Sequence, residues 1–181
     1  MKEKNNPNVQ KILYLAIGST IAFMLYIAFV LTPAGACFKL DSGSNSLGLS
    51  FSYTKDIVLS FFESRSQEQL LCYSQFLQIW DAIFAMIYTL MYASWIVYLF
   101  NKRWLILIPV LGMISDWSEN YIELLMIKTY SNAEVISETI VSLGSGINSI
   151  KWVLSSLTYL IILIGMIIAI RKFFAKPREI F

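Results

Sequence analysis

Four long apolar stretches dominate the pattern of hydrophobic and polar positions. They cover about residues 11–31, 77–100, 104–127 and 150–170. Each is close to the roughly 20 apolar residues that an α-helix needs to cross a bilayer. The first stretch is longer than the roughly 7–15-residue apolar core of a signal peptide, so we expect it to be retained as a helix. The pattern predicts an all-α integral membrane protein in which residues 1–181 form one four-transmembrane-helix bundle.

The first long polar segment, about residues 33–76, contains two kinds of sequence. Residues 41–48 are rich in glycine, serine and asparagine, which predicts an irregular turn. Residues 54–65 carry apolar side chains at helical spacing, which predicts a short amphipathic helix. Ser66 followed by Gln69 matches a capping box, so a further helix is expected to begin there and to continue into the second span.

The second long polar segment, about residues 128–149, has similar signals. Ser131 with Glu134 is another capping-box pattern, which predicts a short helix in this loop. Gly144 and Gly146 predict a break after it, and Asn148 or Ser149 is then available to cap the last span.

Basic residues are concentrated on one side of the predicted bundle. They precede the first span, fill the short connection after the second and follow the fourth: Lys2, Lys4, Lys11, Lys102, Arg103, Arg171, Lys172, Lys176 and Arg178. Loops rich in lysine and arginine remain in the cytoplasm. We therefore expect a multi-pass protein of the cell inner membrane with both termini cytoplasmic and both long loops outside.

Composition narrows the function classes. Only 14% of the residues are charged and 57% are hydrophobic, whereas soluble domains carry about 25% charged residues. A soluble enzyme is excluded, and a net charge of +2 gives no reason to expect nucleic-acid binding. The chain has no histidine, which excludes Ser-His-Asp and Cys-His catalysis and histidine-based metal sites. We expect no cofactor and no metal ion.

Two cysteines, Cys37 and Cys72, both fall in the first outer loop. An even pair on the oxidising side of the membrane favours a disulfide between them. Two free buried thiols are the alternative.

The most unusual chemistry lies inside the third predicted span. Asp116, Glu119, Asn120 and Glu123 follow the spacing i, i+3, i+4, i+7, which places them on one helical face. A carboxylate at the bilayer centre costs about 2.5–3.5 kcal/mol on insertion scales. This face should therefore point into the bundle or toward a wet cavity.

The neighbouring spans offer partners at the same depth. Asp81, Tyr88 and Tyr92 share one face of the second span, and Lys151, Ser155 and Thr158 share one face of the fourth. We expect these residues to converge with the acidic face in the outer half of the bundle. The candidates for binding a ligand or carrying a proton are Asp81, Tyr88, Asp116, Glu119, Asn120, Glu123, Lys151 and Ser155.

Two interpretations of this cluster compete. In one, it lines a pocket for a lipid headgroup, a proton or a small polar or cationic ligand. In the other, Lys151 pairs with a carboxylate, Asn120 bonds to Ser155 or to the backbone, and the network only fixes the helices. Ionisable residues within a membrane usually mark functional sites, which favours the first interpretation.

Several motifs, taken in order, resemble a group of small bacterial four-span membrane proteins without an assigned activity. The motifs are an aromatic loop and helices with the patterns D-x-x-F-x-x-x-Y, D-x-x-E-N and K-W, carried here by Phe51, Tyr53, Asp81, Phe84, Tyr88, Asp116, Glu119, Asn120, Lys151 and Trp152. The resemblance implies that Asp81, Asp116, Glu119, Asn120 and Lys151 belong to one site. The layout is also similar to that of claudins, but the W-GLW-C-C loop pattern of claudins is missing, so only the arrangement of spans is alike.

Three functions fit these features. The first is binding or transport of a ligand, with membrane lipids as partners. The second is an intramembrane enzyme that acts on a lipid by acid–base or metal-assisted chemistry; no nucleophile with an adjacent base is visible, which makes it the weaker candidate. The third is a structural subunit, as a homo-oligomer or within a membrane complex.

Overall fold

The structure of the chain is a computed structural model that describes residues 7–40 and 46–175. This part is helical and contains no β-strand. Most of the predicted turn at 41–48 and the basic residues Lys2, Lys4, Lys176 and Arg178 lie outside the described residues.

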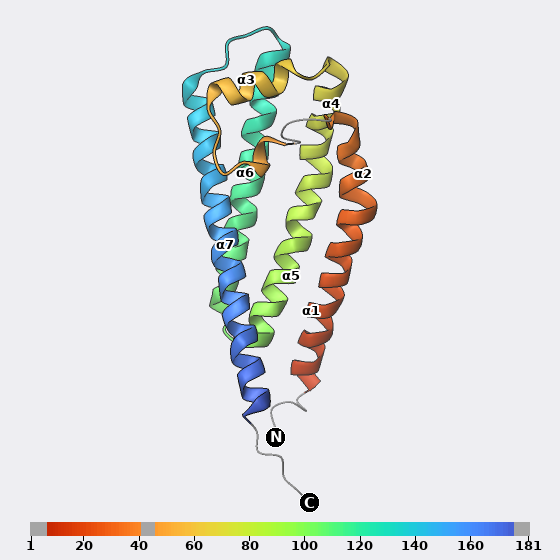
Figure 1. Cartoon of the computed structure of the whole chain (residues 1–181), viewed down its shortest axis with the longest axis vertical. Coiled ribbons are helices and arrows are strands. Elements are labelled where there is room, and N and C mark those ends of the chain that lie inside the picture. Colours follow the sequence, from red (N-terminus) through yellow and green to blue (C-terminus); the bar gives the residue numbers. More distant parts are fainter. Residues whose placement is uncertain (1–6, 41–45, 176–181) are drawn as a thin grey trace, which may run out of the picture.

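Within the described part, four long helical segments run side by side (Figure 1). The first is built from α1 (Pro7–Tyr26), the π-helical turn η1 (Ile27–Leu31), α2 (Thr32–Gly35) and η2 (Ala36–Phe38). The second consists of α4 (Gln67–Gln75), the π-helical turn η4 (Phe76–Asp81) and α5 (Ala82–Phe100). The third is η5 (Arg103–Ile106) with α6 (Leu107–Ser131), and the fourth is α7 (Glu138–Phe174).

Three of these segments are long and apolar enough to cross a membrane: Pro7–Phe38, Gln67–Phe100 and Glu138–Phe174. The all-helical structure and these three segments agree with the all-α membrane protein predicted from the sequence. The remaining helix, α6, has 25 residues but interrupts its apolar sequence with Asp116, Glu119 and Glu123.

The helices pack in two pairs, α1 with α5 and α6 with α7, and α5 joins the pairs. Small and hydroxyl side chains allow α1 and α5 to approach closely. Ser19 Oγ lies 3.1 Å from Ser94 Oγ, and Trp95 donates its indole N–H to Thr20 Oγ1 over 2.9 Å. Ser19 and Thr20 are therefore helix-packing residues, as membrane bundles commonly use them.

A short helix, α3 (Lys55–Glu63), lies across the end of the bundle opposite the start of α1 and the end of α7 (Figure 1). We call this the capped end. The apolar face of α3, formed by Val58, Phe61 and Phe62, is buried. The ring of Phe61 packs on Tyr73 of α4. Thr54 caps the helix by accepting a hydrogen bond from the backbone N–H of Ile57.

Two predictions about the first loop are confirmed. Ser66 and Gln69 form a complete capping box at the start of α4, and the helix continues into α5 without interruption. Cys37 and Cys72 form a disulfide with Cα atoms 6.3 Å apart, which ties the end of the first segment to α4.

The prediction for the second loop is wrong. α6 extends to Ser131, α7 begins at Glu138 with Ser137 as its cap, and α7 continues through Gly144 and Gly146 to Phe174. There is no separate short helix between them in the described chain. Asn148 and Ser149 are interior residues of α7 rather than caps.

Gly144 allows close packing and does not break the helix. A Cβ at this position would lie 2.6 Å from Tyr53 Oη and 2.9 Å from Ile122 Cγ2. The missing side chain therefore lets the loop before α3 and helix α6 approach α7. At Gly146 no such neighbour lies within 4 Å.

These two glycines form a matched pair for a stability test. Gly144→Ala should lower the melting temperature because overpacking costs about 1–3 kcal/mol. Gly146→Ala should leave it unchanged or raise it, because alanine favours a helix by about 0.5–1 kcal/mol over glycine. Thermal unfolding of both variants in detergent checks this, and equal melting temperatures would contradict the close approach at Gly144.

Candidate functional site

One face of α6 carries four polar side chains into the bundle. Asp116 and Asn120 are each 6% exposed, and Glu119 and Glu123 are fully buried. The sequence spacing had predicted that these residues share a face turned away from lipid, and their burial agrees. About two turns of helix thus place three carboxyl groups in the interior.

The ammonium group of Lys151 on α7 lies among the carboxylates. Its Nζ is 3.2 Å from Asp116 Oδ1, contacts Glu119 Oε2 and donates to the carbonyl of Gly48 over 3.2 Å. The ammonium group thus donates hydrogen bonds to Glu119 and Gly48 and forms an ion pair with Asp116. Lys151 is therefore the counter-charge of the cluster.

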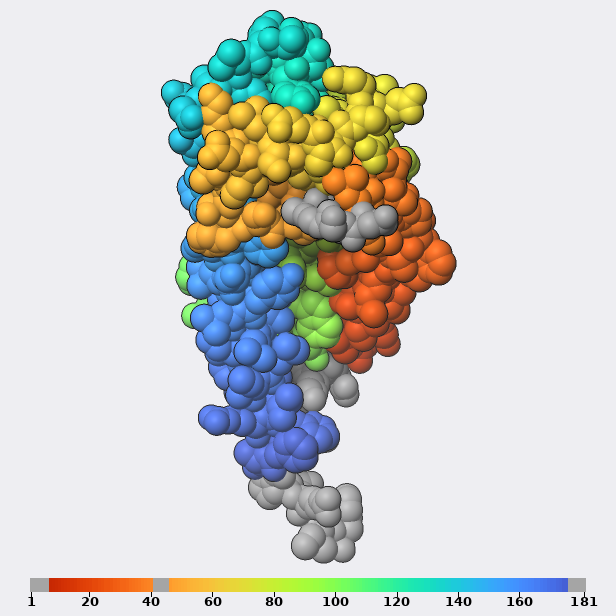
Figure 2. Space-filling model, turned by 45° about the horizontal axis from the view of Figure 1, so that its top comes forward, coloured from red at the N-terminus to blue at the C-terminus, as the bar shows by residue number. Residues whose placement is uncertain are grey.

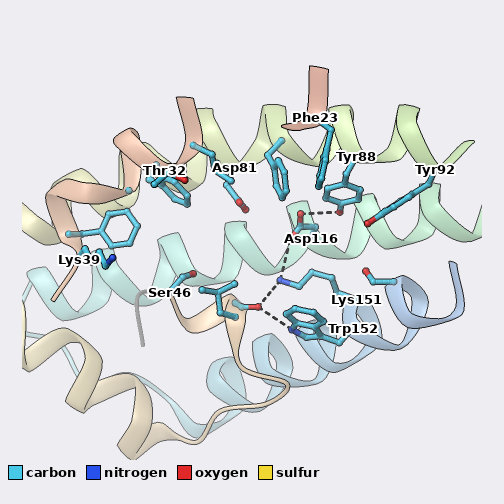
Figure 3. Close-up of a pocket in the computed structure, with 18 of the residues that line it drawn as sticks. Phe23, Thr32, Lys39, Ser46, Asp81, Tyr88, Tyr92, Asp116, Lys151 and Trp152 are labelled. Carbon is cyan, nitrogen blue, oxygen red and sulfur yellow. Dashed lines mark hydrogen bonds and ion pairs between the residues drawn. The ribbon is translucent and has the colours of Figure 1, made fainter. Parts of the chain in front are cut away.

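Gly48 belongs to the loop formed by residues 46–53, which lies against α7. Its carbonyl also accepts the indole N–H of Trp152 over 3.1 Å (Figure 3). A Cβ on Gly48 would lie 3.1 Å from Lys151 Nζ and 3.2 Å from Glu119 Oε1. A side chain here would press on the two ion-paired groups, which favours glycine at this position.

Three polar side chains of α7 fasten the rest of this loop. Asn148 donates to the Ser50 carbonyl, Ser149 Oγ donates to the Phe51 carbonyl over 3.0 Å, and Ser145 Oγ accepts from Tyr53 N over 2.9 Å. Burial, with the nearby carboxyl groups of Glu123 and Glu119, raises the pKa of the Tyr53 phenol, which therefore stays neutral. The loop 46–53 is thus a fixed wall of the site.

Helix α5 and its preceding turn meet the same face of α6. Tyr88 donates its hydroxyl to Asp116 Oδ2 over 3.1 Å. Asn120 donates to Asp81 Oδ2 over 2.8 Å and to the Leu77 carbonyl over 3.4 Å. Asn120 therefore does not bond to Ser155, one of the partners considered from the sequence.

Glu123 lies one turn nearer the capped end. It accepts the hydroxyl of Tyr73, and that hydroxyl in turn lies 3.0 Å from Ser46 Oγ and accepts from Leu47 N over 3.2 Å. Oε1 of Glu123 and Oε1 of Glu119 have no hydrogen-bond partner within the described structure. Glu123 thus links α4 and the loop 46–53 to α6.

A cavity of about 390 Å³ adjoins this network. Figure 2 shows the surface hollowed between α1 and α7, with α5 at its floor. The walls come from α1 to η2, the loop 46–53, η4, α5, α6 and α7. Asp81, Asp116 and Lys151 supply charge, and the exposed Lys39 also lines the cavity. The aromatic lining consists of Phe23, Phe38, Phe76, Phe84, Tyr88, Tyr92, Trp152 and Tyr159.

The two π-helical turns of the described chain flank this cavity. Leu31 ends η1 and Asp81 ends η4, and both residues line it. π-helical turns are rare and occur often at functional sites. The position of the cavity thus coincides with irregular helix geometry on two sides.

The structure divides the residues predicted from the sequence into two groups. The first group lines the cavity and consists of Asp81, Tyr88, Asp116, Lys151 and Ser155. The second group is buried but is not part of the lining, and it consists of Glu119, Asn120 and Glu123. Across the described residues, no three of the carboxyl or thiol groups are placed to hold a metal ion.

Sequence reasoning missed three contributors, Phe23, Gly48 and Tyr73. Tyr73 lies eight residues before Asp81 on one continuous helix, and this spacing could have shown that they share a face. Phe23 is one of many apolar residues on α1 and carries no distinguishing signal. The role of Gly48 depends on a contact with Lys151, which is far away in the sequence.

Comparison with protein-family models, with curated proteins and with solved structures gives no match for this chain. The site is therefore interpreted from its own geometry and chemistry.

Removal of the Lys151 charge should be strongly destabilising. Lys151→Met leaves Asp116 and Glu119 buried without a cation, and breaking a buried pair in this way costs about 3–5 kcal/mol. Lys55→Met removes a solvent-accessible pair with Glu138, whose side chain is 73% exposed, and should have little effect. Thermal unfolding in detergent compares the two, and equally small losses would contradict the central role of the Lys151 pair.

Proposed function

We propose that this chain is a four-span protein of the inner membrane that binds or transports a ligand with a polar head and an apolar body. The cavity between α1 and α7 is its binding site, and membrane lipids are the source of the ligand. The observation that carries the proposal is the 390 Å³ cavity that combines Asp81, Asp116 and Lys151 with aromatic rings. Pockets for small molecules typically have this mixture of apolar walls and few polar groups.

The burial pattern of α6 supports the proposal that α6 also crosses the membrane, in addition to the three more apolar segments. Its three carboxyl groups are withdrawn into the bundle, while the residues on its exposed face include Leu111, Ile114 and Tyr121. A helix whose carboxyl groups all point into the bundle can face lipid with an apolar surface. Basic residues at the end where α1 begins and α7 ends favour a cytoplasmic position for that end. The capped end and the cavity then belong to the outer half.

The direction of access supports a ligand from the membrane. α1 packs on α5 and α6 packs on α7, but α1 and α7 form no closely packed pair. The groove between them (Figure 2) would open sideways into lipid at the depth of Asp81. An apolar chain can remain in the bilayer while its polar head enters the cavity.

One observation favours a structural role as the second candidate. Lys151 finds its ion-pair and hydrogen-bond partners within the protein, and Tyr88 and Asn120 donate to Asp116 and Asp81. Such a network holds three helices in register. It gives no reason for an open cavity beside it, so we rank binding first.

Filling the cavity tests the function directly. Ser155 lines the cavity, whereas the adjacent Ser156, about 100° further round the helix, is exposed and is not part of the lining. Ser155→Trp should reduce the lipid that remains bound through purification, and Ser156→Trp should not. Native mass spectrometry of both variants and the wild type provides the measurement; equal retention by all three would exclude the cavity as the site.

The four-span topology has its own test. Single cysteines are introduced at Asn132 and at Lys102 in a Cys37→Ser, Cys72→Ser background. A membrane-impermeant maleimide should label position 132 in intact cells and position 102 only after the membrane is opened. Labelling of both positions from outside would contradict an α6 that crosses the membrane.

A further inference from the structure

The buried charge around the cavity is unbalanced toward acid, although the exposed Lys39 also lines the cavity. Lys151 forms ion pairs with both Asp116 and Glu119, but its single positive charge can balance only one negative charge. Asp81 takes part in no ion pair within the described chain, and its hydrogen-bond partner, Asn120, is neutral. Uncompensated carboxylates in a low-dielectric site favour the entry of a cation.

Asp81 is the carboxylate that presents itself to a ligand. It lines the cavity and is only partly buried, and Figure 3 shows its carboxylate pointing into the space that faces Lys151 and Ser46. Asn120 binds Oδ2, which leaves Oδ1 for a ligand. Asp116, in contrast, has one oxygen on Lys151 and the other on Tyr88.

Aromatic rings surround the approach to Asp81. Phe84 and Tyr88 follow it at i+3 and i+7, on the same face of the helix. The ring of Phe84 stacks on Phe23 of α1 with centroids 5.4 Å apart and meets Tyr88 edge-on at 5.4 Å. Across the cavity lies Trp152. Rings grouped beside a carboxylate are the recognition chemistry of organic ammonium groups.

We propose that the cavity recognises an organic ammonium group, with Asp81 as its counter-ion and Phe23, Phe84 and Trp152 as its aromatic walls. This inference rests on the proposed function and names the head of the ligand. An anion is disfavoured because Lys151 is already surrounded by Asp116, Glu119 and the Gly48 carbonyl, and the other lysine of the described lining, Lys39, is exposed. The ammonium group is carried by a membrane lipid such as phosphatidylethanolamine, or by a free organic cation, and the test separates these two sources.

The experiment uses the full chain in nanodiscs. In the first arm, the discs contain only phosphatidylglycerol, and choline is titrated in parallel with 3,3-dimethylbutan-1-ol, its uncharged isostere. Calorimetry should detect choline and not the alcohol if the source is a free cation. In the second arm, the discs contain phosphatidylethanolamine and phosphatidylglycerol in equal amounts. Native mass spectrometry should find the former enriched on the protein if the source is a lipid.

Variants tie the preference to the named residues. Asp81→Asn keeps the shape and the contact with Asn120 but should weaken the preferred ligand by about 10-fold or more, because it removes the counter-charge. Phe84→Leu should weaken it by about 5-fold through loss of a cation–π contact. Asp56→Asn, on the exposed side of α3, is the matched control and should change nothing. If Asp81→Asn fails to fold, Phe84→Leu alone tests whether the named residues bind the ammonium group.

The outcomes separate the two proposals. Selectivity for the ammonium compound in either arm, lost in Asp81→Asn or Phe84→Leu, supports the inference. Equal binding of choline and its isostere together with equal retention of both lipids overturns it, as does selectivity that both variants preserve. If lipid is retained without such a preference and Ser155→Trp still removes it, the proposed function survives alone. If Ser155→Trp retains lipid and also binds choline like the wild type, both proposals fail.

Discussion

The position of one ammonium group determines how the described parts of this protein fit together. Lys151 reaches from α7 to Asp116 and Glu119 on α6 and to the carbonyl of Gly48 in the loop 46–53. A charge buried this deeply is tolerated only when its partners are fixed around it. The requirement explains why the loop approaches at a glycine, and why Asp116 is then held in place for Tyr88 of α5. The network ends at α5, and α1 is attached separately through Ser19 and Ser94. A groove therefore remains between α1 and α7, and it is this groove that leads to the charged residues.

Much of this arrangement could be predicted from local spacing. Apolar length located three helices that are long and apolar enough to cross a membrane. The helical period placed Asp116, Glu119, Asn120 and Glu123 on one buried face. The cost of charge in a bilayer then required a partner, and Lys151 was the one basic residue predicted at the same depth. Such predictions succeed because they depend only on the spacing of residues within one helix and on whether each residue faces lipid or the protein interior. The capping box at Ser66 is predictable for the same reason.

The remaining features depend on contacts between distant parts of the chain. Gly144 and Gly146 look alike as helix breakers, yet α7 passes through both because Tyr53 and Ile122 fill the space beside Gly144. The aromatic wall on α1 could not be predicted, since Phe23 differs from its apolar neighbours only in facing Phe84. Likewise, nothing local to residues 46–53 indicates that Asn148 and Ser149 bind that loop to α7. The charged residues of the site could thus be predicted from the sequence, whereas the shape of the cavity beside them could not.

The central claim is that the cavity holds a lipid-borne ligand beside the Lys151 network. Photo-crosslinking in reconstituted vesicles tests it most directly, with a phospholipid that carries a photoactivatable group near its head. The account predicts that adducts, mapped by mass spectrometry, concentrate on cavity residues such as Phe23, Phe84 and Trp152. Exposed residues on the outer surface, such as Phe29 and Leu160, should carry far fewer. Adducts spread evenly over the exposed surface, with none in the cavity, would contradict the account and leave the buried charges with a purely structural role.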